Sequence, residues 1–164
     1  MPAGFNILFA LTILASLGCG LVAGLFFAFS VSVMRGLARL PAAEGIAAMQ
    51  SINLAIINPW FLGVFFGTAV LCLALAGSAM WGWHQPGAGY LLVGSLLYLI
   101  GTILVTIFFN VPMNDALASV AATSTDSAGL WVDYLARWTA WNHVRTIAAL
   151  AATASIVIGL YRST

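Results

Sequence analysis

Four long runs of apolar residues, separated by shorter polar segments, dominate the pattern of this chain. They cover residues 5–34, 60–83, 89–110 and 139–161. Because about 20 residues of helix cross the roughly 30 Å hydrocarbon core of a bilayer, each run is long enough to span a membrane. The pattern predicts an all-α fold: an integral membrane bundle of four transmembrane helices, forming one domain over residues 1–164.

The segment between the first two runs, residues 36–58, is less apolar than its neighbours. Pro41 is followed three residues later by Glu44, and both residue types favour the first turn of a helix. Asn58 and Pro59 then close the segment. We therefore expect a short interfacial helix between spans one and two.

The fourth run is too short to cross a membrane from its polar boundary. Only 16 residues separate Arg145 from Arg162, which is about 24 Å of helix. The crossing helix must therefore begin upstream, near Trp138. This places Asn142, His143 and Arg145 at or just inside the membrane boundary, where ionisable side chains face the bundle or a wet cavity and are candidates for function.

Four spans place both long polar connections, residues 35–59 and 110–141, on the same side of the membrane. The 84–87 turn and both termini lie on the other side. The arginines on the first side are Arg35, Arg39, Arg137 and Arg145, against Arg162 on the second. The positive-inside rule then predicts that the two connections are cytoplasmic, and we expect the protein in a bacterial cytoplasmic membrane.

Small residues recur at four-residue spacing in the first two spans. Gly20, Gly24 and Ala28 form one such stripe, and Gly63 and Gly67 form a GxxxG pair. Stripes of this kind let another helix approach closely. They suit packing within the chain and packing between subunits equally. A homo-oligomer is therefore possible.

Composition excludes the soluble classes of protein. Hydrophobic residues make up 63% of the chain and charged residues 5%, and the mean hydropathy is +1.08. So little charge cannot solvate the surface of a soluble fold. A net charge of +1 without any Lys also gives no basic surface for nucleic acid. We expect the lipid bilayer itself to be the partner of this apolar chain.

The segment 131–146 concentrates three of the six Trp residues with two Arg. A membrane-interface belt of Trp and Arg would explain those residues. It would not explain Asn142 and His143 at the same depth, or Asn110 and Asn114 on the same side. Buried amides need partners, and we expect them to meet one another, water or a ligand.

No metal or cofactor site stands out in the sequence. His84 and His143 lie near opposite ends of the bundle, so one chain cannot use both on one ion or haem. We expect no cofactor. The alternative is a metal or haem site, with His143 and either Asp115 or Asp133 as the ligands that the sequence offers.

Four segments resemble a known family in their order and in their amino-acid sequence. They are GLFFAFSVSVMRGLARLP at 24–41, AMQSINLAIINPWF at 48–61, FNVPMNDAL at 109–117 and WTAWNHVRT at 138–146. Together they resemble the small four-span membrane proteins named after anthrone oxygenases, a family long carried as a domain of unknown function. The resemblance covers about residues 10–160.

The resemblance implies an oxidoreductase, a monooxygenase of the membrane. Characterised fungal members oxidise a polyphenolic anthrone to an anthraquinone with O₂ and need no added cofactor. A planar polyphenolic or quinone-like molecule is then the expected substrate. The positions that match the family's motifs are Asn110, Asn114, Asp115, Trp138, Trp141, Asn142, His143 and Arg145.

A mechanism follows as a hypothesis from this resemblance. His143 is the catalytic base, because histidine is the side chain that titrates nearest neutrality. Arg145, with the amide of Asn142 or Asn110, stabilises the enolate oxygen that forms. On a regular helix His143 points away from Arg145. The two can act together only if the helix is distorted or if substrate lies between it and the third span.

The remaining candidates bind the substrate. Trp138 and Trp141 are expected to stack on its flat rings. Asn114, Asp115 and, from the first polar connection, Asn53 complete the predicted binding set.

A non-enzymatic protein is the alternative, one that binds a lipid, a quinone or a partner protein through the same Trp, Asn and Arg cluster. A channel or carrier is disfavoured, since its polar residues would run along the spans, and here they gather at one end.

Overall fold

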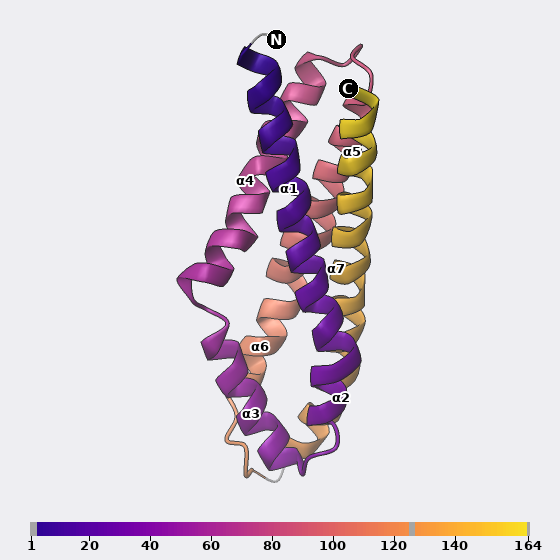
Figure 1. The fold of residues 1–164 in the computed structure, drawn as a ribbon. Coiled ribbons are helices and arrows are strands. Elements are labelled where there is room, and N and C mark those ends of the chain that lie inside the picture. The colour runs from indigo at the N-terminus through magenta and orange to yellow at the C-terminus, as the bar shows by residue number, and fades with distance from the viewer. Residues whose placement is uncertain (1–2, 125–126, 164) are drawn as a thin grey trace.

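The computed structural model describes residues 3–124 and 127–163, and Figure 1 shows them as a bundle of long helices. The elements in chain order are α1 (Ala3–Ala28), the π-helix η1 (Phe29–Val33), α2 (Met34–Leu37), α3 (Ala42–Ala55), α4 (Pro59–Trp81), α5 (Ala88–Tyr98), the π-helices η2 (Leu99–Leu104) and η3 (Thr106–Asn110), α6 (Val111–Ala118) and α7 (Ser127–Ser163).

These elements form four long rods. The first rod is α1, η1 and α2 in succession, the second is α4, the third is α5, η2, η3 and α6, and the fourth is α7. Each rod is long and apolar enough to cross a membrane. The prediction of an all-helical protein with four membrane-capable helices is confirmed, and α3 is the short helix expected between the first two.

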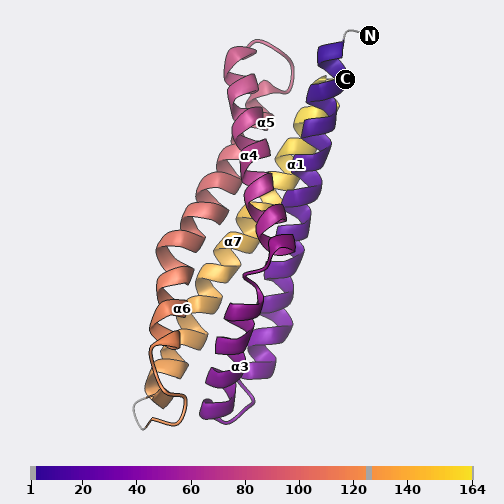
Figure 2. The same cartoon turned by 90° about the vertical axis from the view of Figure 1, so that its left-hand side faces the viewer.

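The two ends of the bundle differ, as the number of spans predicts. The chain ends and the α4–α5 turn lie at one end, while α3 and the α6–α7 connection lie at the other (Figures 1 and 2). We call the second end the cap, comprising α2, α3, α6 and residues 127–141 of α7.

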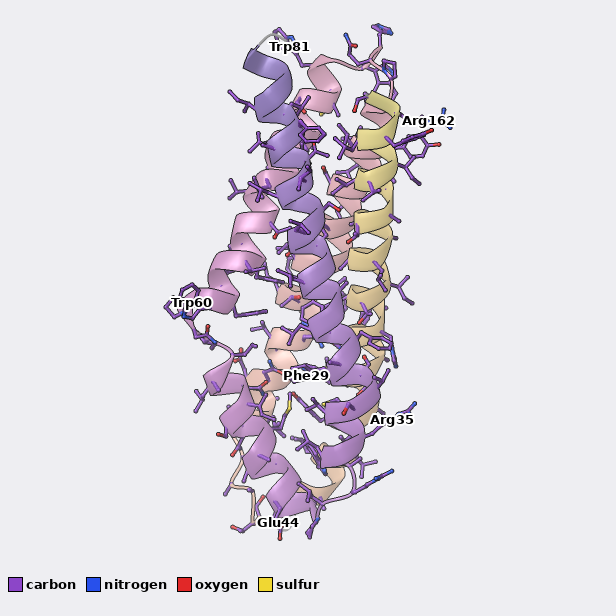
Figure 3. All side chains as sticks on the ribbon, in the orientation of Figure 1. Phe29, Arg35, Glu44, Trp60, Trp81 and Arg162 are labelled. Atoms are coloured by element: carbon purple, nitrogen blue, oxygen red, sulfur yellow. The ribbon has the colours of Figure 1, made fainter. Side chains whose placement is uncertain are left out.

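The length of α4 fixes where a membrane fits. Its 23 residues extend about 34 Å, close to the hydrocarbon thickness. Trp60 and Trp81, at its two ends, are 87% and 96% exposed, and Figure 3 shows Trp60 projecting away from the bundle. Trp at both ends of a span is typical of the membrane interfaces. We therefore expect the cap to lie beyond the hydrocarbon, on the far side of Trp60.

The third and fourth rods are longer than the predicted spans. The fourth begins at Ser127 and is one α-helix without interruption to Ser163. The third continues past Pro112 to Ala118. Pro112 lacks the N–H that a regular helix requires, and the π-helical turn η3 directly precedes it. The chain thus passes this proline without ending the rod.

The elbow between α3 and α4 is built by local side-chain bonds. Asn58 is extended, and its Oδ1 accepts hydrogen bonds from the N–H groups of Trp60 and Phe61, while Pro59 takes the first helical position. This is a standard start for a helix.

At the cap, Gln50 Nε2 donates to the carbonyl of Leu117 at 2.8 Å, tying α3 to α6.

Buried residues form two clusters, one in each half of the bundle. The cluster in the membrane half joins all four rods. The cap has its own cluster, comprising Met34, Leu37, Ile46, Met49, Leu117, Trp131, Tyr134 and Trp138. The second cluster holds α3 and α6 against the start of α7. The candidate site lies where the two clusters meet.

The glycines that allow close helix packing are not those of the GxxxG pair. A Cβ on Gly24, Gly63 or Gly67 would meet nothing within 4 Å. By contrast, a Cβ on Gly101 would lie 2.5 Å from Ala148 Cβ, and one on Gly94 would lie 2.7 Å from Ile156. Gly94 and Gly101 thus allow the third and fourth rods to approach closely, and Gly18, whose Cβ would clash with Thr68, does the same for the first and second rods.

Candidate functional site

Asn142 joins the fourth rod to the first in the interior of the bundle. Its side chain is fully buried. Nδ2 donates to the carbonyl of Phe26 at 2.6 Å and to Ser30 Oγ at 2.7 Å. Ser30 belongs to the π-helical turn η1. Oδ1 is left facing the next turn of α7, where it accepts a hydrogen bond from Arg145.

Arg145 is a buried cation whose described partners are all neutral. The side chain is 4% exposed. Nη2 donates to Asn142 Oδ1 at 2.7 Å and Nη1 to Thr106 Oγ1 at 3.2 Å. Cζ lies 4.1 Å from the ring centroid of Phe26 and 5.2 Å from that of Trp138. Nε has no hydrogen-bond partner among the described residues.

This environment leaves the positive charge of Arg145 uncompensated. In the described part of the chain the ion pair found is Asp133–Arg137, which is exposed. Two aromatic faces and two neutral acceptors recover some of the lost hydration, since a desolvated cation–π contact contributes about 2 kcal/mol. A buried charge without a counter-charge remains unfavourable. The arrangement therefore favours a ligand that carries, or develops, negative charge beside Arg145.

Arg145 lies about one turn of helix inward from the level of Trp60. Its guanidinium stacks on Phe26, and the Phe26 ring packs edge-on against Phe65, 6.4 Å between centroids. Phe65 is five residues into the bundle from Trp60, which marks the interface. The depth of Arg145 in the membrane stays a prediction.

The π-helical turns supply polar groups from the neighbouring rods. Ser30 lies in η1, and Thr106 and Asn110 lie in η3. A π turn carries an extra residue, which changes the direction of the side chains around it, and such turns are frequent at functional sites. Here they aim a hydroxyl at Asn142 and another at Arg145.

A second polar group lies on the cap side of Arg145. Asn114 Oδ1 accepts hydrogen bonds from Tyr134 Oη at 2.9 Å and from Trp138 Nε1 at 2.8 Å. Asn110 Nδ2 donates to the carbonyl of Trp138 at 3.3 Å, and its buried Oδ1 has no partner among the described residues. These bonds fix the indole of Trp138 between α6 and Arg145.

A cavity of about 540 Å³ lies against this network, between the α3–α4 elbow, the first rod, η3–α6 and α7. Its volume is within the range of small-molecule sites. Figure 3 shows Phe29 pointing inward from the first rod. The aromatic lining residues are Phe26, Phe29, Phe61, Phe65, Phe66 and Trp138. The polar lining residues are Gln50, Asn53, Thr106, Asn114, Asp115 and Arg145.

The rim of the cavity between α4 and η3 is formed by exposed apolar residues. Phe66 of α4 and Ile107 of η3 both line the cavity, and they are 50% and 45% exposed. Phe66 lies on the same helix as Trp60, six residues further into the predicted span. Figure 1 shows α4 leaning away from α1 toward its Pro59 end. The cavity therefore has apolar, exposed residues on this side of its rim.

Comparison with known families agrees with this picture. A sequence model of the family described as anthrone oxygenase matches residues 60–155, more than half of the chain. The chain belongs to the anthrone oxygenase family. Comparison with curated proteins gave no match, and comparison with solved structures gave none.

The family match covers most of the predicted site and part of the cavity. It includes the segment from Asn110 to Asp115 and the segment from Trp138 to Arg145, and it stops short of Asn53 and the first rod. Family membership and four membrane-capable helices together make this a membrane oxygenase-like protein.

The structure brings most of the predicted site residues together. Five of them line the cavity, namely Arg145, Trp138, Asn114, Asp115 and Asn53. Asn142 and Asn110 lie directly behind, where they hold Arg145 and Trp138.

Two predicted residues lie elsewhere. The ring of Trp141 stacks on Phe109, 3.7 Å between centroids, and lines a separate groove of about 280 Å³ on the outside of the bundle. His143 is exposed and lines neither the groove nor the cavity. Because α7 is a regular helix here, the distortion that would turn His143 toward Arg145 does not occur.

No set of three His, Cys, Asp or Glu side chains within residues 3–124 and 127–163 is arranged to hold a metal ion. His84 lies in the α4–α5 turn, at the end of the bundle opposite the cap. The cavity offers amides, one hydroxyl, one carboxylate and one guanidinium, a set suited to binding an organic molecule with oxygen substituents.

The sequence reading missed Thr106, Ser30 and the phenylalanines of the cavity. Thr106 and Ser30 are polar residues inside apolar spans, a signal that was present. The sequence gives no signal for the phenylalanines, because aromatic residues of a membrane span are usual both on the lipid side and inside the bundle.

Proposed function

We propose that this protein oxidises a planar phenolic ketone of the anthrone type to the corresponding quinone with O₂, without a cofactor. The observation that carries the proposal is the aromatic cavity with Arg145 at its inner end. Flat aromatic walls suit a polycyclic substrate. A buried guanidinium without a carboxylate partner suits an oxygen atom that becomes negative during the reaction.

The chemistry needs only the substrate and O₂. An anthrone has a CH₂ group opposite its ketone, and the net change is C₁₄H₁₀O + O₂ → C₁₄H₈O₂ + H₂O for the parent compound. Loss of a proton from the CH₂ group gives an electron-rich enolate. The enolate passes one electron to O₂, and the radical pair combines to a peroxide at that carbon. Loss of water from the peroxide then leaves the new carbonyl group.

Arg145 acts on the first of these steps. As the proton leaves, negative charge moves onto the ketone oxygen, and a guanidinium held in place stabilises it without reorganisation. Thr106 and Asn142 hold the guanidinium by its two Nη atoms. Phe26 and Trp138 cover its faces and keep water away. One preorganised donor of this kind contributes about 10²–10³-fold to a rate.

The test is oxygen consumption by the purified protein in lipid nanodiscs with 1,8-dihydroxyanthrone as probe. We expect O₂ uptake above the protein-free rate, one O₂ for each anthraquinone formed, and one ¹⁸O atom in the product from ¹⁸O₂. Metal analysis and absorbance of the same sample check the absence of a cofactor. Binding of the probe with no O₂ uptake above background would instead favour the non-enzymatic binding protein.

A further inference from the structure

The proposed reaction requires a base, and the inner end of the cavity offers none. Arg145 is a cation, Thr106 is a hydroxyl and Asn114 is an amide whose oxygen already accepts two hydrogen bonds. We infer that the carboxylate of Asp115 is the general base that removes the proton from the substrate. This inference rests on the function proposed above.

Asp115 lies on the face of α6 that forms one wall of the cavity. Val111, Asn114 and Ala118 line the cavity from the same helix, at the spacing of three and four residues that defines one helical face. Asp115 is exposed, and no hydrogen bond or ion pair to its carboxylate is found in the described part of the chain. Its oxygens are thus free to accept a proton, and water at the cap can take that proton onward.

The other carboxylates of the chain are less suited to this role. Asp133 is paired with Arg137 at 3.2 Å on the exposed surface, and the groove it lines is not the cavity. Glu44 is exposed at the end of the cap, where Figure 3 shows it far from Phe29. Asp115 is the carboxylate that lines the cavity among the described residues.

Asp115 and Arg145 line the same cavity from different rods. Arg145 contacts Thr106, and Asp115 follows nine residues later along the same rod, roughly 13 Å of helix axis. In an anthrone the ketone oxygen and the CH₂ group lie on opposite sides of the central ring. A substrate with its ketone at Arg145 would have its CH₂ group on the side of the ring away from Arg145, and we infer that this side faces Asp115.

His143, the base predicted from the sequence, competes with Asp115 for this role. It lies on the outer face of α7 and would need the helix to rotate before it could reach the cavity. Asp115 needs no such change. The two residues lie on different helices, so single variants separate them.

The proton transfer balances without any further reactant. The C–H bond of the substrate breaks, the proton goes to an oxygen of Asp115, and the electron pair moves through the ring to the ketone oxygen beside Arg145. O₂ is not needed for this step. In the absence of O₂ the step is reversible, so the CH₂ hydrogens exchange with solvent.

Anaerobic exchange is therefore the test. Protein in nanodiscs is mixed with 1,8-dihydroxyanthrone in D₂O without O₂, and deuterium in the CH₂ group is followed by mass spectrometry. We expect wild-type protein to accelerate exchange, Asp115→Asn to lose about 10²–10⁴-fold of that acceleration, and Asp115→Glu to keep part of it. Glu44→Gln, which removes an exposed carboxylate elsewhere in the cap, is the matched control and should behave as wild type.

The outcomes separate this inference from the proposed function. Asp115 is exposed, so Asp115→Asn should fold normally, and thermal unfolding of the variant checks this. If wild-type protein oxidises the anthrone and Asp115→Asn exchanges and oxidises it equally fast, Asp115 is not the base and the proposed function stands. Loss of exchange in His143→Gln alone would assign the role to His143. If wild-type protein neither exchanges nor oxidises the probe, both proposals are wrong.

Discussion

Arg145 Nη2 donates a 2.7 Å hydrogen bond to Oδ1 of Asn142, one turn earlier on α7. The acceptor is a neutral amide, so the bond orients the guanidinium and leaves its charge in place. Asn142 can accept this bond because its Nδ2 is turned toward Phe26 and Ser30 of the first rod. One side chain thus connects two rods and sets the direction of the cation that faces the cavity.

Removal of that cation should reduce activity far more than stability. In Arg145→Met an apolar side chain of similar length replaces a buried, uncompensated charge, and such replacements are often neutral or stabilising. We expect oxidation of 1,8-dihydroxyanthrone to fall about 10²–10³-fold, while thermal unfolding in detergent changes little. Arg162→Met, at the opposite end of the bundle, is the control and should keep wild-type activity. An active Arg145→Met variant would remove Arg145 from the mechanism.

Truncation of Asn142, unlike removal of the Arg145 cation, should reduce the stability of the protein directly. Asn142→Ala removes three buried hydrogen bonds and leaves Arg145 Nη2 without its acceptor. We expect a loss of about 1–3 kcal/mol in the free energy of unfolding, measured by denaturant titration in mixed micelles. His143→Ala, one residue further along and exposed, should change stability by less than about 0.5 kcal/mol. Equal effects of the two substitutions would contradict the buried role of Asn142.

The sequence predicted Arg145 and Asn142 as site residues for a physical reason. Sixteen residues between Arg145 and Arg162 cannot cross a bilayer, so Arg145 had to lie inside it, and a buried Arg needs polar neighbours. The partners on other rods could not be found in the same way. Ser30 and Thr106 reach the pair because π-helical turns redirect their side chains, and such turns leave no periodic pattern in the sequence.

The packing of the rods was also predicted only in part. GxxxG spacing singled out Gly63 and Gly67, but spacing does not say which face of a helix meets another helix. The structure turns those two residues outward and uses Gly94 and Gly101 instead. The third rod also extends past Pro112, because a π-helical turn accommodates the proline that a sequence pattern treats as a helix end.

Substitution of Gly101 tests which glycines the fold requires. A Cβ there would lie 2.5 Å from Ala148 Cβ, so Gly101→Ala should force the third and fourth rods apart and destabilise the protein by about 1–3 kcal/mol. Gly67→Ala has open space and should be neutral or slightly stabilising, as Ala is the better helix former. Thermal unfolding in detergent compares the two. A Gly67→Ala change that alters the oligomeric state instead would assign the outer stripe to subunit contacts.

The arginines near the cap predict the orientation of the protein in the membrane. Arg35, Arg39 and Arg137 are exposed at that end, against Arg162 at the other. The positive-inside rule predicts a cytoplasmic cap and both termini on the outer side. In a bacterial host, alkaline phosphatase fused after Thr164 should be active, and green fluorescent protein at the same place should be dark. The reverse result would place the cap outside.

We expect the substrate to enter the cavity from the lipid. One bulky residue at the rim of the cavity should then slow the reaction. Ile107 lines the cavity and is 45% exposed, so Ile107→Trp places a large ring across the opening between η3 and α4 without entering the packed core. We expect kcat/KM for 1,8-dihydroxyanthrone in nanodiscs to fall at least about tenfold, with little change in thermal unfolding. Val70→Trp adds the same ring to a lipid-facing position of α4 away from the cavity, and it should leave kcat/KM unchanged. This comparison distinguishes two routes of entry, because the cavity is also lined by Asp115 and Gln50, which belong to the cap. Substrate that entered by that aqueous route would reach Arg145 past an unaltered rim, and Ile107→Trp would then retain full activity.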